Sequence, residues 1–237
     1  EKSNQATEEI YNSELTRIRN YYQARGEAGS KAQIEEEKTA KELIEALSVE
    51  PPVEAMVEAV EKKKEKKNPP LLFNLAELQA ECAKRFKISP DETLRIVQEM
   101  YEKKLVTYPR TDARVLSTAI ATEIDKNLRG LCRMPQVSNF AAEILNNGLY
   151  KGIVKSKYTD DSKISDHYAI IPTGQGLNNL AGLPPTAAKV YEVIARRFLS
   201  IFYPPAVYRK VSIVLKRDDE SFFANFKVLA DKGYLKV

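Results

Sequence analysis

This sequence has little of what metal sites, disulfide scaffolds and membrane proteins require. It has 237 residues, with only two cysteines and one histidine. Cys82 and Cys132 form no CxxC pair and no Cys/His cluster of metal-ligand spacing, so we expect two buried free thiols and no metal site. No apolar run approaches the roughly 20 residues that a membrane span needs, and the N-terminus lacks the apolar core of a signal peptide. We therefore expect an intracellular protein without a membrane partner.

The residues that are present suffice for a folded core. The hydrophobic content is 43%, which supports one large domain or two smaller ones. The chain does not start with methionine, and we expect it to be a fragment of something longer. The net charge is only +4, but basic residues gather in "EKKKEKKNPP", residues 61–70. On charge alone, a solvated strand end or linker is favoured there over a nucleic-acid site.

Strand patterns occur near both ends of the chain. Alternation through Val53 and Val57 predicts a half-buried strand that ends within the lysine run. The segment 206–228 alternates twice around an acidic turn and predicts a hairpin. Because an isolated strand needs sheet partners, we expect an α+β fold. It would be a discontinuous β-rich arch domain, formed by residues 1–67 and 207–237, which carries an inserted all-helical domain, residues 68–206.

Helix signals fill the rest of the chain. Amphipathic helices are predicted over residues 8–24 and 33–47. In the central block, Asn74 and Ser89 are expected as N-caps of two successive helices. The predicted apolar stripes of these two helices are Leu75, Leu78, Cys82 and Phe86, then Leu94, Val97 and Tyr101. Two helices joined by a short turn are typical of a helix-turn-helix unit of winged-helix-like character, and also of ordinary packing. Further helices are predicted after Ser117, over 137–145 and over 186–201.

Tyr108 lies where the second central helix gives way to a turn before Pro109. A tyrosine phenol has an unperturbed pKa near 10, so as a nucleophile it needs a nearby cation or a base. Arg110 can be that cation and can also bind phosphate oxygens. The alternative is a packing role, since the chain has twelve tyrosines. The single histidine, His167, is either a hydrogen-bonded structural residue or an acid, base or phosphate ligand.

Three segments, in this order, resemble the central part of the type IA DNA topoisomerases, most closely the topoisomerase III branch. They are "PPLLFNLAELQAECAKRF", "SPDETLRIVQEMYEKKLVTYPRTDARVLS" and "SDHYAIIPTG". The resemblance covers roughly residues 50–237. It implies an ATP-independent enzyme that cleaves one DNA strand through a 5′-phosphotyrosyl intermediate, passes a strand through the gate and religates. It also implies single-stranded DNA as the partner, and we expect a cytoplasmic, nucleoid-associated monomer.

The resemblance also assigns residues. It makes Tyr108 the nucleophile, Arg110 the helper at the scissile phosphate and His167 a phosphate contact. It places further residues, with less support from the motifs, on a DNA-binding surface: Gln79, Thr111, Asp112, Arg114 and Thr173. Two positions depart from the family pattern: Ala113 replaces the usual serine, and Tyr168 stands where glutamate is frequent.

The family's magnesium-binding toprim domain is not recognisable in this sequence. The acidic runs "TDDSKISD" and "RDDES" fit solvated turns better than a metal site. We therefore expect no cofactor in this fragment and Mg²⁺ in the full-length enzyme, bound by the toprim domain of the same chain. The fragment is expected to bind single-stranded DNA weakly and not to relax supercoils by itself.

Two other readings remain open at this stage. One is a metal-independent, recombinase-like tyrosine enzyme that forms a 3′ linkage, although such sites gather several arginines and histidines. The other is a non-enzymatic winged-helix-type DNA-binding module whose tyrosine stacks on a base.

Overall fold

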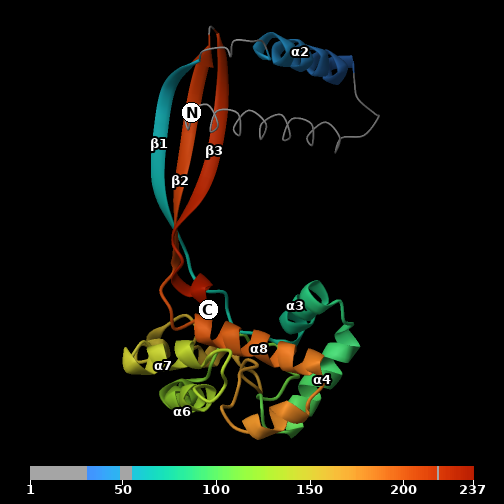
Figure 1. The fold of residues 1–237 in the computed structure, drawn as a ribbon, viewed down its shortest axis with the longest axis vertical. Helices are drawn as coiled ribbons and strands as arrows, with labels where there is room; N and C mark the ends of the chain where they lie inside the picture. Colours follow the sequence, from blue (N-terminus) through green and yellow to red (C-terminus); the bar gives the residue numbers. More distant parts are fainter. Residues whose placement is uncertain (1–30, 49–54, 218) are drawn as a thin grey trace. The chain divides into compact units, whose positions relative to one another are not determined.

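The computed structural model describes residues 31–48, 55–217 and 219–237 and has an α+β fold (Figure 1). Its described residues form two compact units. One unit contains the described residues up to Glu65 together with Arg209–Val228, and the other contains Lys66–Tyr208 and Leu229–Val237. The α+β class is confirmed, whereas the domain limits expected at 67/68 and 206/207 stay a prediction.

The first described element is helix α2, Lys31–Leu47, which confirms the helix predicted over residues 33–47. Ser48 follows it, and its amide and its hydroxyl both donate to the carbonyl of Ile44. The helix predicted over residues 8–24 lies outside the described residues.

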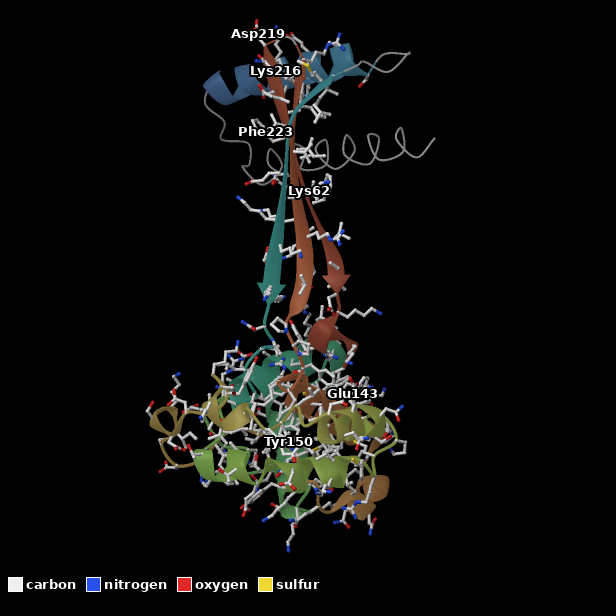
Figure 2. The ribbon with its side chains drawn as sticks, turned by 90° about the vertical axis from the view of Figure 1, so that its left-hand side faces the viewer. Lys62, Glu143, Tyr150, Lys216, Asp219 and Phe223 are labelled. Atoms are coloured by element: carbon white, nitrogen blue, oxygen red, sulfur yellow. The ribbon has the colours of Figure 1, made fainter. Side chains whose placement is uncertain are left out.

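Three strands form one sheet in the order β1-β2-β3. They are β1, Met56–Lys67, β2, Ala206–Arg217, and β3, Glu220–Asp231. The predicted hairpin is thus confirmed as β2 and β3. Figure 2 shows the side chains of Lys62 on β1 and Phe223 on β3 extending from the strands, and Phe223 is 57% exposed.

Strand β1 ends in the lysine run as predicted, at Lys67, but differs from the prediction in burial. The alternating pattern predicted a half-buried strand, whereas all residues of β1 are exposed. Val53 lies outside the described residues. A strand face is buried only where another layer covers it, and an alternating pattern cannot establish that layer. The lysines and glutamates suit an edge strand, because charges there oppose pairing with another chain.

The first two helices of the larger unit begin at the predicted caps. Helix α3, Leu75–Phe86, is capped by Asn74, whose side chain accepts from the Glu77 amide at 2.9 Å. Helix α4, Pro90–Glu102, is capped in the same way by Ser89, with proline at its start. The two helices pack against each other. Their helix-turn-helix character stays a prediction.

The buried face of α4 matches the predicted one only at Val97. Its buried residues are Thr93, Ile96, Val97 and Met100, whereas Leu94 is half-buried and Tyr101 is 40% exposed. Thr93 can occupy the core because its hydroxyl donates to the Ser89 carbonyl at 3.0 Å. This rotation of the helix leaves Tyr101 on the surface, where it becomes part of the site described below.

Helix α8, Pro185–Ser200, contributes nine buried residues and contacts α3 and α4 (Figure 1). The predicted helices after Ser117 and over 137–145 are confirmed as α5, Thr118–Thr122, and α7, Ser138–Asn146. Helix α6, Ile124–Leu131, packs against α7. Four short 3-10 helices complete the unit: Ile153–Lys155, Asp161–Lys163, Leu177–Gly182 and Gly233–Lys236.

Glu143 on α7 connects that helix to the last residues of the chain. Its carboxylate accepts from the Lys236 ammonium at 2.7 Å and from the Tyr203 hydroxyl at 2.9 Å. The hydrogen bond from Lys236, aided by that from Tyr203, lowers the pKa of Glu143 below its usual value. The charged carboxylate therefore contributes to the stability of this unit.

We expect Glu143→Gln to lower stability at neutral pH but not in acid. The pKa of Glu143 is lower in the folded than in the unfolded chain, so its contribution is present above the unfolded pKa of about 4.3. That contribution disappears as the pH falls through the folded pKa. Urea unfolding of wild type and variant at pH 7 and near pH 3 measures this. A free-energy difference that persists undiminished in acid would show that the carboxylate's charge is not responsible.

Candidate active site

The two segments that carry Tyr108 and His167 lie side by side. Val106 and Pro172 form an antiparallel bridge, and so do Phe73 and Ile170. The Thr107 amide donates to the Ile171 carbonyl at 3.0 Å. Backbone pairing therefore brings the tyrosine and histidine motifs together, although some sixty residues of sequence separate them.

The Thr107 and Thr111 hydroxyls join the two segments on either side of Tyr108. The Thr107 hydroxyl donates to the Ala169 carbonyl at 2.9 Å and accepts from the Ile171 amide at the same distance. The Thr111 hydroxyl donates to the His167 carbonyl at 2.6 Å. Since Thr111 is only 7% exposed, its hydroxyl serves to hold the histidine segment in place.

Tyr108 lies at a pocket of about 360 Å³. The residue is half-buried, and its ring lies 4.3 Å from the His167 ring and 5.3 Å from the Tyr101 ring, centroid to centroid. The pocket is lined by Tyr101, Lys104, Val106, Thr107, Tyr108, His167, Tyr168, Thr173 and Gln175. Tyr108 is thus accessible to a ligand in the pocket and is not enclosed in the apolar core.

The structure brings together only some of the expected site residues. Tyr108, His167 and Thr173 line the pocket. Arg110 and Asp112 are exposed, two and four residues after the tyrosine. The other three have partners within the fold. Thr111 donates to the His167 carbonyl, the Gln79 amide donates to the Pro90 carbonyl, and the Arg114 guanidinium donates to the Leu72 carbonyl and to Glu77. The catalytic and DNA-binding roles of all these residues stay predictions.

Six pocket residues were not predicted from the sequence: Tyr101, Lys104, Val106, Thr107, Tyr168 and Gln175. The position of Tyr101, seven residues before Tyr108, gave no signal of its own. Tyr168 was noticed only as a departure from the family pattern. Burial raises the pKa of Tyr168, so this side chain is neutral at pH 7. At this position glutamate is frequent in the family pattern. A neutral phenol in place of a negatively charged carboxylate lowers the electrostatic repulsion between the pocket and a phosphate.

One wall of the pocket is held by helix α6. The Asn127 side chain donates to the Pro172 carbonyl at 2.9 Å, and Arg133 donates to the Gly174 carbonyl at 3.0 Å. A Cβ atom on Gly130 would lie 2.1 Å from the Gly174 carbonyl oxygen. This close approach of two backbones requires glycine at position 130 and fixes the loop that carries Thr173 and Gln175.

The described residues do not provide a metal site. No group of three or more His, Cys, Asp or Glu side chains lies close enough together to hold an ion within residues 31–48, 55–217 and 219–237. The two adjacent acids of "TDDSKISD" have partners of their own: Asp160 is paired with Lys163, and Asp161 accepts from Thr118.

Comparisons with known proteins agree with this arrangement. The sequence model of the DNA topoisomerase family matches residues 3–237. DNA topoisomerase 3 from Bacillus cereus is 36% identical over 185 residues, and that from Bacillus subtilis is 37% identical over 187. These alignments cover 77% and 78% of this chain but only 25% of each relative. Full-length topoisomerase I from Thermotoga maritima is structurally similar, with a TM-score of 0.58 and 25% identity over 84% of this chain and 31% of that one.

The chain therefore belongs to the type IA DNA topoisomerases. The resemblance seen in its motifs is confirmed. Its similarity to the two Bacillus enzymes places it in the topoisomerase III branch of that family. It spans about a quarter of the length of these relatives. Separately, no helix within the described residues is long and apolar enough to cross a membrane.

Proposed function

We propose that this chain carries the nucleophile of a type IA topoisomerase, with Tyr108 cleaving one strand of DNA. The observation that supports this best is the pocket in which Tyr108 meets His167. The tyrosine is accessible and in ring contact with the histidine, and threonine hydroxyls hold the two segments together.

In the proposed step the phenol oxygen of Tyr108 bonds to the phosphorus of a phosphodiester. The bond between phosphorus and the 3′ oxygen breaks, leaving a 5′-phosphotyrosyl link and a free 3′-hydroxyl. The phenol loses its proton and the departing oxygen gains one, so protons and charge balance, and the reverse step reseals the strand. Arg110 stabilises the charge on the phosphate during transfer, and His167 contacts a phosphate oxygen.

We propose that the other parts of the reaction lie elsewhere in a longer protein. A toprim domain of the same chain would supply Mg²⁺, which positions the phosphate and supports religation. Strand passage would use the β-rich arch, with hinges near Pro69-Pro70 and Pro204-Pro205. On this account the working enzyme is a monomer that acts on single-stranded DNA.

Binding and relaxation assays with the purified 237-residue chain test this proposal. We expect it to bind a single-stranded oligonucleotide weakly and to leave negatively supercoiled plasmid unrelaxed, with or without Mg²⁺. The complete gene product should relax the plasmid without ATP. Relaxation by the 237-residue chain alone would contradict the need for a further domain, and absence of DNA binding would contradict the proposed function itself.

A further inference from the structure

Lys104 has a backbone conformation that a lysine rarely adopts. Within the described residues, only Lys87 and Lys104 combine a side chain with a positive φ, and that of Lys104 is 61°. Lys104 follows the C-cap of α4: its amide donates to the Tyr101 carbonyl and the Leu105 amide to the Met100 carbonyl, both at 2.9 Å. This pair of bonds is the Schellman pattern, in which glycine is the usual residue at this position. The lysine is therefore present in spite of the local backbone geometry.

The histidine-bearing segment holds the backbone of Lys104 in place. The Thr173 hydroxyl donates to the Lys104 carbonyl at 2.5 Å, and the Thr173 amide donates to the Leu105 carbonyl at 3.0 Å. Gly176 packs so closely that a Cβ on it would lie 2.4 Å from the Lys103 carbonyl oxygen. The base of the Lys104 side chain is thus fixed relative to Tyr108, four residues further along the chain.

Lys104 is among the residues that line the pocket containing Tyr108 and His167. Lys104 is exposed, and within the described chain its ammonium forms no ion pair. The neighbouring Lys103, by contrast, pairs with Glu99 at 2.6 Å. A lysine ammonium without a carboxylate partner, beside a nucleophilic tyrosine, suits a phosphate group.

A purely structural explanation also exists, and Lys87 provides the comparison for it. A cation at the C-terminal end of a helix interacts favourably with the helix dipole. Lys87 ends α3, has a φ of 59° and is also exposed, but it does not line the pocket. The two lysines therefore share helix-end position, backbone strain and charge, and differ in their distance from the site.

We propose that Lys104 binds a non-bridging phosphate oxygen of the DNA strand held at the Tyr108 pocket. This inference rests on the proposed function and adds to it a phosphate-binding residue to which the family resemblance gave no role. The ligand of Lys104 would be a phosphodiester of a nucleic acid. The ammonium would contact it as a point charge and would make no contact that depends on the identity of the base.

The test compares Lys104→Gly, Lys104→Arg and the matched control Lys87→Gly. Affinity of the 237-residue chain for a labelled single-stranded oligonucleotide is measured by fluorescence anisotropy at several salt concentrations, and stability by thermal unfolding. Glycine relieves the positive φ at both positions, so neither glycine variant should melt below wild type. We expect Lys104→Gly to reduce the slope of log K against log salt by about 0.7, the effect of losing one phosphate contact on a single strand. Lys104→Arg and Lys87→Gly should keep the wild-type slope.

The outcomes separate this inference from the function on which it rests. If wild type binds DNA and Lys104→Gly keeps the wild-type slope, Lys104 is not a phosphate ligand, while the proposed function stands. An equal loss in Lys104→Gly and Lys87→Gly also overturns the inference, because it shows an effect of net charge alone. If wild type does not bind single-stranded DNA, the proposed function fails and this inference fails with it.

Discussion

Replacing Tyr108 by phenylalanine is expected to abolish covalent cleavage of DNA by the complete gene product while it still binds single-stranded DNA. The change removes only the hydroxyl, and the ring can keep its contact with His167 at 4.3 Å between centroids. Loss of a covalent nucleophile lowers rates by on the order of 10⁶-fold in a well-studied protease, so no adduct should be detectable. The measurement is the amount of protein–DNA adduct trapped by denaturant, alongside oligonucleotide affinity.

Tyr150→Phe is the matched control for this experiment. Tyr150 is half-buried in the same unit, lies outside the pocket and is labelled in Figure 2. The control should form adduct as the wild type does. A Tyr108→Phe protein that still forms adduct would remove Tyr108 from the mechanism. Unchanged unfolding curves for both variants exclude misfolding as the reason for a loss.

Gly130→Ala is expected to destabilise the larger unit by roughly 3 kcal/mol, at the upper end of the cost of overpacking a core. The added Cβ would lie 2.1 Å from the carbonyl oxygen of Gly174, and a backbone atom cannot move aside as a side-chain end can. Alanine also gains about 1 kcal/mol of helix propensity within α6, which is too little to offset the clash. Urea unfolding measures the difference.

Gly152→Ala provides the comparison for that variant. A Cβ there meets no atom within 4 Å, and the φ of Gly152 is −95°, which any residue can adopt. We expect a change within about 0.5 kcal/mol, as for other surface substitutions. Since the Gly174 loop carries Thr173 and Gln175, Gly130→Ala should also weaken DNA binding. A Gly130→Ala protein as stable as Gly152→Ala would mean that the two backbones are not in close contact.

Local signals in the sequence predicted local structure well. Asn74 and Ser89 cap α3 and α4 as expected, because the cap depends on residues within one turn of the helix. The hairpin of β2 and β3 was predictable for the same reason. Burial was less predictable, because it depends on what covers an element. Strand β1 is exposed throughout in spite of its alternating pattern, and α4 presents Thr93 and Met100 to the core instead of Leu94 and Tyr101.

In the candidate site, too, the residues in recognisable motifs were predicted, and those placed by long-range packing were not. Tyr108 and His167 were predicted through the family resemblance of their motifs, and the structure places their rings in contact. Tyr101 and Lys104 enter the pocket because the segment around Thr173 folds back onto the end of α4. The spacing of residues in the sequence gives no sign of this long-range packing. Thr111, expected on the DNA-binding surface, has its hydroxyl bonded to the His167 carbonyl, and its DNA-binding role stays a prediction.

The central claim is that the hydroxyl of Tyr108 becomes joined to the 5′ phosphate at the break in the DNA. The most direct measurement incubates the complete gene product with a single-stranded oligonucleotide labelled at either its 3′ or its 5′ end, and traps the complex with denaturant. The account predicts that the 3′ label migrates with the protein, while the 5′-labelled piece is released with a free 3′-hydroxyl. Migration of the 5′ label with the protein would instead indicate a 3′ linkage and would contradict the account.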